Sequence, residues 1–319
     1  MIKPSELPLA TDGSLYHIHL TGSTLADKVL LVGDPERVNM FKGIFESIEH
    51  ESHNRELHAL TGRYHGTRFT ALSTGMGCDN IDIVMTELDA AANIDIKTTR
   101  HQDSETSSAA RGLAVSKSRS LEIVRIGTSG SLQEDIDCGS HVASAYAIGL
   151  DGLMNYYKEW DVKSGMCKEM EESLLRHMDL DSRLARPYCV QGSTLLLEKV
   201  ASDMHHGITV TAPGFYGPQG RTVRLHPSIE NLNEKLASFE WTSSLQDIKS
   251  QPLEVSKSRS LKITNLEMET SAIYGFSHLL GHDALTVCLI IANRPRGTFL
   301  ADYHPQMRQL VGSVVERLT

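Results

Sequence analysis

Arginines close to the ends of apolar segments are the first side chains in this sequence whose positions suggest chemistry. Arg125 interrupts the apolar run LEIVRIG, and a buried guanidinium needs an anionic partner. Arg37 follows a turn at residues 33–35, where free backbone amides and a helix dipole would favour an anion. Thr128 and the two residues after it offer further donors to a small anion such as phosphate. A surface cap for Arg37 and a structural ion pair for Arg125 would leave the same pattern.

Two carboxylates stand close together in the motif NLEMETSA, where a strand-like run changes into a helix-like one. They are Glu267 and Glu269, with Met268 between them. A carboxylate can accept both hydrogen bonds of a vicinal diol, such as that of a ribose. Alternatively, both carboxylates only favour the N-terminal end of the following helix.

The glycine-rich stretch GFYGPQGR, residues 214–221, predicts a loop that carries recognition groups. Gln219 presents a donor and an acceptor, Arg221 presents fixed donors, and Phe215 supplies an aromatic face. This combination suits a small planar ring with carbonyls and an imide N–H, as in uracil. A polar turn without a ligand is the alternative.

Histidine and cysteine patterns predict no metal site. His17 and His19 in LYHIHL would share one face of a strand, and His205 and His206 are adjacent. The first pair has no acidic or cysteine partner close by in sequence, and we expect no zinc site at either pair. The five cysteines lack a CxxC pair, which favours reduced thiols over a disulfide framework or a zinc site.

Several apolar, β-rich runs precede these polar motifs and indicate the elements that position them. Continuous apolar runs are typical of strands buried on both faces, in sheets covered by helices. In such α/β folds ligands usually bind at the carboxyl ends of the strands. The runs cover residues 28–33, 68–75, 121–127, 207–213 and 285–292.

Helical patterns fit between these runs. Asp34 and Pro35 indicate an N-cap and a first helical residue. Asn80 is expected to cap a second helix, and a third helix should run from near Glu269 to Gly281. Apolar spacing predicts a further helix at the C-terminus. The alternating pattern therefore indicates an α/β protein, whose length allows one large domain or two smaller ones.

Two polar, serine-rich segments interrupt the pattern, near residues 97–120 and 240–260. Both contain the heptapeptide VSKSRSL, at residues 115–121 and 255–261, and each copy leads into a strand-like run. We interpret both segments as surface insertions without an assigned function.

The overall charge argues against broad classes of partner. A net charge of −9 and a pI of about 5.9 disfavour general affinity for nucleic acid or an anionic membrane. The longest apolar run, ALTVCLIIA, is well short of the roughly 20 residues that span a bilayer. The N-terminal segment has no export pattern, so a cytoplasmic protein is expected.

Six motifs resemble, in the same order, those of the nucleoside phosphorylase family, and within it the branch that acts on uridine. They are VGDPERV, STGMG, VRIGTSGSLQ, FYGPQGR, EMETSAIYG and IIANR. The resemblance implies a single α/β domain over residues 1–319, with a twisted central mixed β-sheet flanked by helices. It also implies a homodimer or a hexamer with active sites shared between subunits, and no cofactor beyond inorganic phosphate as co-substrate. The implied reaction is reversible phosphorolysis of uridine to uracil and α-ribose 1-phosphate.

The resemblance further implies a role for each residue that matches a family motif. Phosphate would be held by Gly33, Arg37, Arg125 and Thr128, with Arg55 reaching in from a neighbouring subunit. Ribose would be held by Met268 and Glu269, with His17 of the neighbour on the 5′-hydroxyl. The base would meet Phe215, Gln219, Arg221 and Arg294. The groups implied to act in catalysis are Arg125, Thr128, Gln219, Arg221 and Glu269.

One difference from family relatives and one match to them affect these expectations. Purine phosphorylases of this fold should place an aspartate after the last core strand to protonate the leaving base, whereas this chain has Ala292, Asn293 and Arg294. A purine phosphorylase or a nucleosidase on the same fold remains the alternative, and a non-catalytic nucleoside-binding protein is a further one. Glu56 and the region near Asn80 match a cation site of some relatives, so K⁺ is a candidate ligand there.

Overall fold

The protein is described from a computed structural model of the 319-residue chain. The structure describes residues 2–95, 119–161, 165–178, 180, 183–242 and 260–319. The serine-rich segments and most of both VSKSRSL copies lie outside these residues, so the interpretation of them as insertions stays a prediction.

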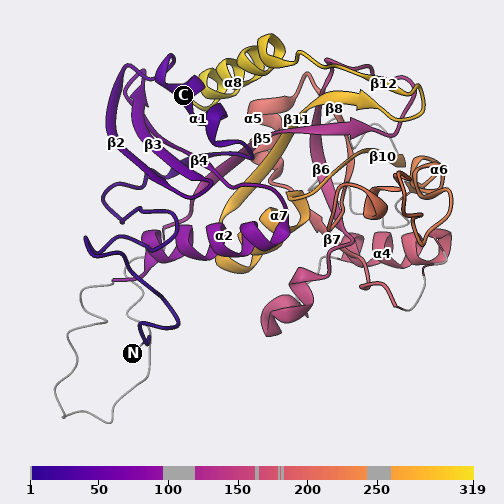
Figure 1. The fold of residues 1–319 in the computed structure, drawn as a ribbon, viewed down its shortest axis with the longest axis horizontal. Coiled ribbons are helices and arrows are strands. Elements are labelled where there is room, and N and C mark those ends of the chain that lie inside the picture. Colours follow the sequence, from indigo (N-terminus) through magenta and orange to yellow (C-terminus); the bar gives the residue numbers. More distant parts are fainter. Residues whose placement is uncertain (1, 96–118, 162–164, 179, 181–182, 243–259) are drawn as a thin grey trace.

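One twisted mixed sheet joins the strands of the described residues (Figure 1). Five strands form its centre, and each pairs with the next until the last returns to the first. These strands are β5 (Glu122–Ser131), β11 (Asp283–Asn293), β6 (His141–Gly149), β8 (His205–Thr211) and β10 (Ser260–Glu267). The pairing therefore closes the central strands into a ring.

Four further strands extend this ring on one side (Figure 1). In spatial order they are β1 (Lys28–Val32), β4 (Thr67–Ser73), β3 (Leu57–Tyr64) and β2 (Ser47–Asn54). Three short strands complete the sheet. Strand β7 (Tyr188–Gln191) pairs with β6, β9 (Glu240–Thr242) pairs with β10, and β12 (Thr298–Phe299) pairs with β11.

Strand β1 shows why the apolar runs are continuous. Leu30 and Val32 pack into one hydrophobic core, whereas Val29 and Leu31 pack into a second core. Successive side chains of a strand point to opposite faces, so a strand between two cores needs apolar residues at every position. The prediction of strands buried on both faces is confirmed.

Strand β5 is longer than predicted. The apolar run ends at residue 127, but the strand continues to Ser131. Thr128 and Ser129 stay in the sheet because they pair with Leu289 and Ile290 of β11. The polar donors after Arg125 are thus held by a strand rather than by a loop.

Two helices that flank the site confirm a predicted boundary each, the start of one and the end of the other. Helix α1 (Pro35–Lys42) begins after Asp34, whose side chain accepts a hydrogen bond from the Glu36 amide at 2.9 Å. Helix α7 (Thr270–Leu280) ends at Gly281, which has a left-handed φ of +77°.

The cap predicted for the second helix is wrong. Helix α2 (Cys78–Asn93) already includes Asn80 in its first turn, and Gly77 is the capping residue. The Asn80 side chain instead faces the Met76 carbonyl oxygen, 3.5 Å away. Helix α8 (His304–Leu318) confirms the helix expected at the C-terminal end.

The remaining helical segments of the described residues surround the sheet (Figure 1). They are η1 (Leu153–Tyr156), η2 (Lys158–Asp161), α4 (Gly165–Met178), α5 (Thr194–Ala201), η3 (Gly217–Gln219) and α6 (Leu232–Ala237). None of the helices in the described ranges is both long and apolar enough to cross a membrane.

Candidate active site

A cavity of about 810 Å³ opens where the carboxyl ends of the strands converge. Strands β5 and β10 are antiparallel but pair through their last residues, so their carboxyl ends meet. The turn after β1, the segments after β4 and β8, and the ends of β5, β10 and β11 all contribute to the wall. The predicted residues that line it are Gly33, Arg37, Arg125, Thr128, Phe215, Gln219, Arg221, Met268, Glu269 and Arg294.

Arg37 is a buried cation in the wall of this cavity. Its side chain leaves helix α1, and the residue is only 7% exposed. Nη1 donates to the carbonyl oxygen of Ile126 at 3.2 Å, but Arg37 has no ion pair with any residue that the structure describes. A surface cap is therefore the wrong interpretation of Arg37. A buried guanidinium without a carboxylate favours the binding of an anion from solution.

Arg125 forms a structural ion pair, which was one of the two interpretations that the sequence allowed. Nη1 lies 3.1 Å from an oxygen of Glu267, and Nη2 donates to Glu269. Burial would lower the pKa of Arg125, but the carboxylates of Glu269 and Glu267 outweigh this effect and raise it. The guanidinium therefore stays charged, while its buried Nε has no hydrogen-bond partner among the described residues.

The backbone beside Arg125 leaves room for its guanidinium. A Cβ atom on Gly127 would lie 2.3 Å from Nη1 and 2.7 Å from Cζ of Arg125. Residues two apart on a strand point to the same face, so the Arg125 side chain folds back over Gly127. The sequence interpretation did not assign Gly127 a function, because nothing in the motif shows which way Arg125 bends.

The two glutamates, whose roles the sequence left open, differ in their partners. Glu267 accepts hydrogen bonds from the amides of Glu269 and Thr270, each at 3.0 Å, and from the Thr211 hydroxyl at 2.7 Å. Glu267 thus stabilises the start of α7, as one interpretation of the motif proposed.

Glu269 is the carboxylate with fewer internal partners. It accepts from the Gly77 amide at 2.7 Å and from Arg125, and it lines the cavity. Burial raises the pKa of Glu269, although Arg125 acts in the opposite direction. Two carboxylates share one guanidinium here, so the cluster carries excess negative charge and can accept hydrogen bonds from hydroxyl groups.

The loop after β8 holds its recognition groups in one arrangement. Arg221 Nη1 donates to the Phe215 carbonyl oxygen and to Gln219 Oε1, both at 2.6 Å. The Arg221 Cζ atom lies 3.7 Å from the Phe215 ring centroid, within the range of a cation–π contact. Gln219 is buried, while its Nε2 has no hydrogen-bond partner among the described residues. The loop is thus ordered by its own side chains and still offers donors to the cavity.

A second arginine, Arg294, supports this loop from the end of β11. Its Nη2 donates to the Gln219 carbonyl oxygen at 3.3 Å, and its buried Nη1 has no partner in the described part of the chain. Burial lowers the pKa of Arg221 to about 10, and repulsion by Arg294 acts in the same direction. Burial also lowers the pKa of Arg294. Two neighbouring cations at this end of the cavity favour negative charge on a bound ring.

Asn293 occupies the end of the last core strand and is bound to protein groups. Its Nδ2 donates to the carbonyl oxygens of Gln133 at 3.0 Å and Ile136 at 2.9 Å. Its Oδ1 accepts from the amide of Arg296 at 3.0 Å. An amide fixed in this way has no proton to give to a leaving base.

Two of the predicted residues, His17 and Arg55, do not line the cavity of their own chain. His17 Nδ1 lies 2.5 Å from Glu87, and Arg55 lies in the exposed turn between β2 and β3 with φ +56°. The resemblance assigned both to a neighbouring subunit, which stays a prediction. The expected strand at His17 and His19 is wrong, because residues 16–18 form a turn and His19 has φ +51°.

The candidate residues for a monovalent cation lie close together. Glu56 and Asn80 both pack against Gly75, whose hypothetical Cβ would lie 3.0 Å from Glu56 Cγ and 2.3 Å from Asn80 Nδ2. Glu56 also lines the cavity. Binding of K⁺ at these residues stays a prediction.

Known proteins share this fold and sequence pattern. A nucleoside phosphorylase from Trypanosoma brucei, described as showing uridine phosphorylase activity, superposes with a TM-score of 0.81 and 28% identity over 97% of this chain and 99% of that one. A uridine phosphorylase from Phytophthora capsici superposes with a TM-score of 0.62 at 19% identity, over 99% of this chain and 97% of that one, and supports the fold.

Sequence comparison adds two relatives and the family. The uridine phosphorylase of Thermococcus kodakarensis is 25% identical over 92% of this chain and 83% of its own length. A DeoD-type purine nucleoside phosphorylase of Colwellia psychrerythraea is 24% identical over 86% of this chain and 85% of its own length. The sequence pattern of the Phosphorylase superfamily matches residues 27–318, which is nearly the whole chain. This chain therefore belongs to the Phosphorylase superfamily.

Proposed function

We propose that this protein is a uridine phosphorylase, which converts uridine and phosphate reversibly into uracil and α-ribose 1-phosphate. The observation that carries the proposal is the set of three groups in one cavity. The cavity is lined by Arg37, which has no carboxylate partner among the described residues, by the carboxylate of Glu269 and by the Gln219–Arg221 pair. These groups match a phosphate, a sugar diol and a pyrimidine edge.

The proposed mechanism relies on electrostatic preorganisation rather than on a protein nucleophile. As the glycosidic bond stretches, positive charge builds on the ribose ring and negative charge on the pyrimidine. Phosphate held by Arg37, Arg125 and Thr128 balances the first charge and attacks C1′. Arg221 and Gln219 stabilise the second charge through the carbonyl oxygens of the base.

The base end of the cavity favours a pyrimidine over a purine. A leaving purine needs a proton on its imidazole ring, and the Asn293 amide cannot supply one. Gln219 can accept a hydrogen bond from the imide N–H through Oε1 while its Nε2 donates to a carbonyl oxygen. The names of the Trypanosoma and Thermococcus relatives support the same choice, whereas the purine-cleaving relative keeps the alternative open.

We further propose an oligomeric state, the binding partners and a cellular location for this protein. We include a homodimer or hexamer, because His17 and Arg55 lie outside the cavity of their own chain. Small-molecule nucleoside and phosphate are the only partners proposed. A cytoplasmic location is included because the five cysteines form no CxxC pair in the sequence, a pattern that favours reduced thiols. A K⁺ ion at Glu56 and Asn80 is a secondary proposal that a potassium titration of the activity would test.

The test is release of free base from uridine and, separately, from inosine, each with and without inorganic phosphate. We expect uracil release that depends on phosphate and little release of hypoxanthine. Hypoxanthine as the main product would replace the substrate assignment with a purine. Turnover without phosphate would indicate a nucleosidase, and binding of uridine without turnover would indicate a non-catalytic protein.

A further inference from the structure

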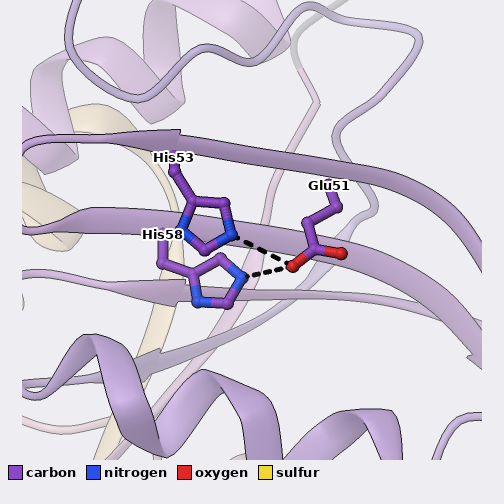
Figure 2. Close-up of side chains that lie close together, drawn as sticks. All are labelled: Glu51, His53 and His58. Carbon is purple, nitrogen blue, oxygen red and sulfur yellow. Dashed lines mark hydrogen bonds and ion pairs between the residues drawn. The ribbon is translucent and has the colours of Figure 1, made fainter.

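Three side chains gather on one face of the hairpin formed by β2 and β3. Glu51 and His53 are two residues apart on β2, so they point to the same face of the sheet. His58 on β3 is the direct cross-strand partner of His53. Figure 2 shows the carboxylate and both imidazole rings turned toward one another. The sequence interpretation did not consider this set, because only the pairing of β2 with β3 brings its members together.

The ligand atoms of these residues are close enough to bind one ion. Nε2 of His53 lies 3.1 Å from Glu51 Oε1, and Nε2 of His58 lies 3.0 Å from the same oxygen. One ligand atom from each residue lies within 4.8 Å of the other two. Zinc binds imidazole nitrogen and carboxylate oxygen at about 2.0–2.2 Å, so neighbouring ligands of one ion sit a little over 3 Å apart, about as here.

The hydrogen bonding of His58 points to a cation between its ring and Glu51. Nδ1 of His58 lies 3.2 Å from the carbonyl oxygen of Pro35 in α1, and a carbonyl oxygen can only accept. Nδ1 is therefore the donor to Pro35, and in the neutral tautomer that this requires Nε2 is an acceptor that faces the carboxylate oxygen. Two acceptors at this distance need a proton or a metal ion between them. Metal-binding histidines typically donate their second ring nitrogen to a backbone carbonyl in this way.

The packing of the rings fixes their direction. The His58 side chain is 2% exposed, and its ring stacks on that of His53 with centroids 3.7 Å apart. The His53 side chain is 62% exposed and the Glu51 side chain 33%, so the outer side of the cluster is open to solvent. An ion can therefore enter without unfolding the hairpin.

Lys42, in the last turn of α1, is the competing cation. Its Nζ lies 2.6 Å from Glu51 Oε1, the oxygen that both histidines face. The Lys42 side chain is 42% exposed and flexible, so the ammonium group can move into solvent when another cation takes its place. A bound ion and Lys42 would compete for the same carboxylate.

We propose that Glu51, His53 and His58 form a binding site for one divalent transition-metal ion, with zinc as the best match. Two imidazoles and one carboxylate are a ligand set that zinc accepts, with water in the remaining position. Calcium and magnesium prefer ligand sets made only of oxygen, so they fit poorly. The ion would link β2 to β3 and, through the bond from His58 to Pro35, to the start of α1.

The test uses the full-length chain without an affinity tag, stripped of metal with a chelator and then titrated with Zn²⁺ in a calorimeter. We expect one ion per chain and a higher melting temperature in its presence. Co²⁺ in place of zinc should give visible absorption that reports imidazole coordination. His53→Ala, His58→Ala and Glu51→Gln should each lose most of the affinity.

Matched variants separate this site from general metal binding. His65 lies 3.2 Å from Glu46 in a similar exposed pair that has no third ligand among the described residues, so His65→Ala should leave the affinity unchanged. Lys42→Met should bind zinc more tightly than the wild type, because it removes the competing ammonium group.

The proposal fails if the stripped wild type binds no zinc, or binds it equally well with His53 and Glu51 replaced. In the first case the cluster is a network of proton-mediated hydrogen bonds only. Should His58→Ala fail to fold, the exposed His53→Ala carries the same test, since its fold can be checked by circular dichroism. An unchanged affinity in Lys42→Met would also count against a shared carboxylate.

Discussion

Substitution of Gly127 by alanine tests whether the position of Arg125 controls phosphate binding. The added methyl group would lie 2.3 Å from Nη1, 2.7 Å from Cζ and 3.0 Å from Nη2 of Arg125. The end of a flexible arginine would normally move aside at little cost. Here the guanidinium is buried and bound to both Glu267 and Glu269, so it can move only by losing those contacts.

The expected magnitude follows from those contacts. Overpacking a core costs about 1–3 kcal/mol, and disrupting a buried ion pair costs about 3–5 kcal/mol when one partner is lost. Because Arg125 is displaced rather than removed, we expect a loss of about 3 kcal/mol. If the same displacement weakens the transition state, kcat/KM for phosphate should fall roughly 100-fold.

The assay measures uridine phosphorolysis at varied phosphate, together with thermal unfolding. Gly312→Ala is the matched control: it makes the same change in helix α8, where an added Cβ would meet nothing within 4 Å. This control should keep full activity and gain a little stability, because alanine is the better helix former. If Gly127→Ala leaves the phosphate kinetics and the melting temperature unchanged, phosphate binding does not depend on the position of the Arg125 guanidinium over Gly127.

Three further variants give separable outcomes. Arg37→Met should raise the KM for phosphate strongly while the melting temperature holds or rises, because it removes a buried cation that has no carboxylate partner in the described part of the chain. A large loss of stability would contradict this account. Arg221→Ala should lower kcat/KM for uridine by about 10²–10³-fold and leave phosphate binding largely intact, and equal loss of both would indicate a structural role. Glu269→Gln should lower uridine turnover yet stabilise the fold, measured by denaturant unfolding from pH 4 to pH 8. Since burial raises the folded pKa of Glu269 above its unfolded value, its contribution favours folding at low pH and is lost as pH rises through the folded pKa. The stability gain of Glu269→Gln should therefore grow as pH rises above about 4.5, and a gain that shrinks with pH would refute the raised pKa.

Features with local sequence signals were predicted best. Asp34 before Pro35 placed the start of α1, and Gly281 placed the end of α7, because caps depend on residues next to the helix end. The gathering of the polar motifs in one cavity was also predictable, because ligands in α/β folds usually bind at the carboxyl ends of the strands.

Features that depend on distant partners were missed. The extra length of β5 comes from pairing of Thr128 with Leu289 in β11, far along the chain. Glu267 and Glu269 differ in role because Thr211 donates to the first and Gly77 to the second. No local sequence pattern connects these donors to the two glutamates. Tertiary partners outweighed local propensity in each case.

The link between Arg125 and Glu269 predicts that phosphate and nucleoside assist each other in binding. In this structure, the arginine expected to hold phosphate is bound to the carboxylate expected to hold the ribose hydroxyls. A bound phosphate dianion would draw the guanidinium toward itself and leave Glu269 free to accept hydrogen bonds from the sugar. Such coupling typically amounts to about 1–3 kcal/mol, or roughly 5–150-fold in affinity.

Calorimetric titration with a non-cleavable uridine analogue, with and without phosphate, should show tighter binding when phosphate is present. Glu269→Gln should lose this effect because its amide does not hold the guanidinium. Equal affinity for the analogue with and without phosphate in the wild type would mean that Arg125 contacts phosphate and Glu269 at the same time, so that phosphate does not release the carboxylate.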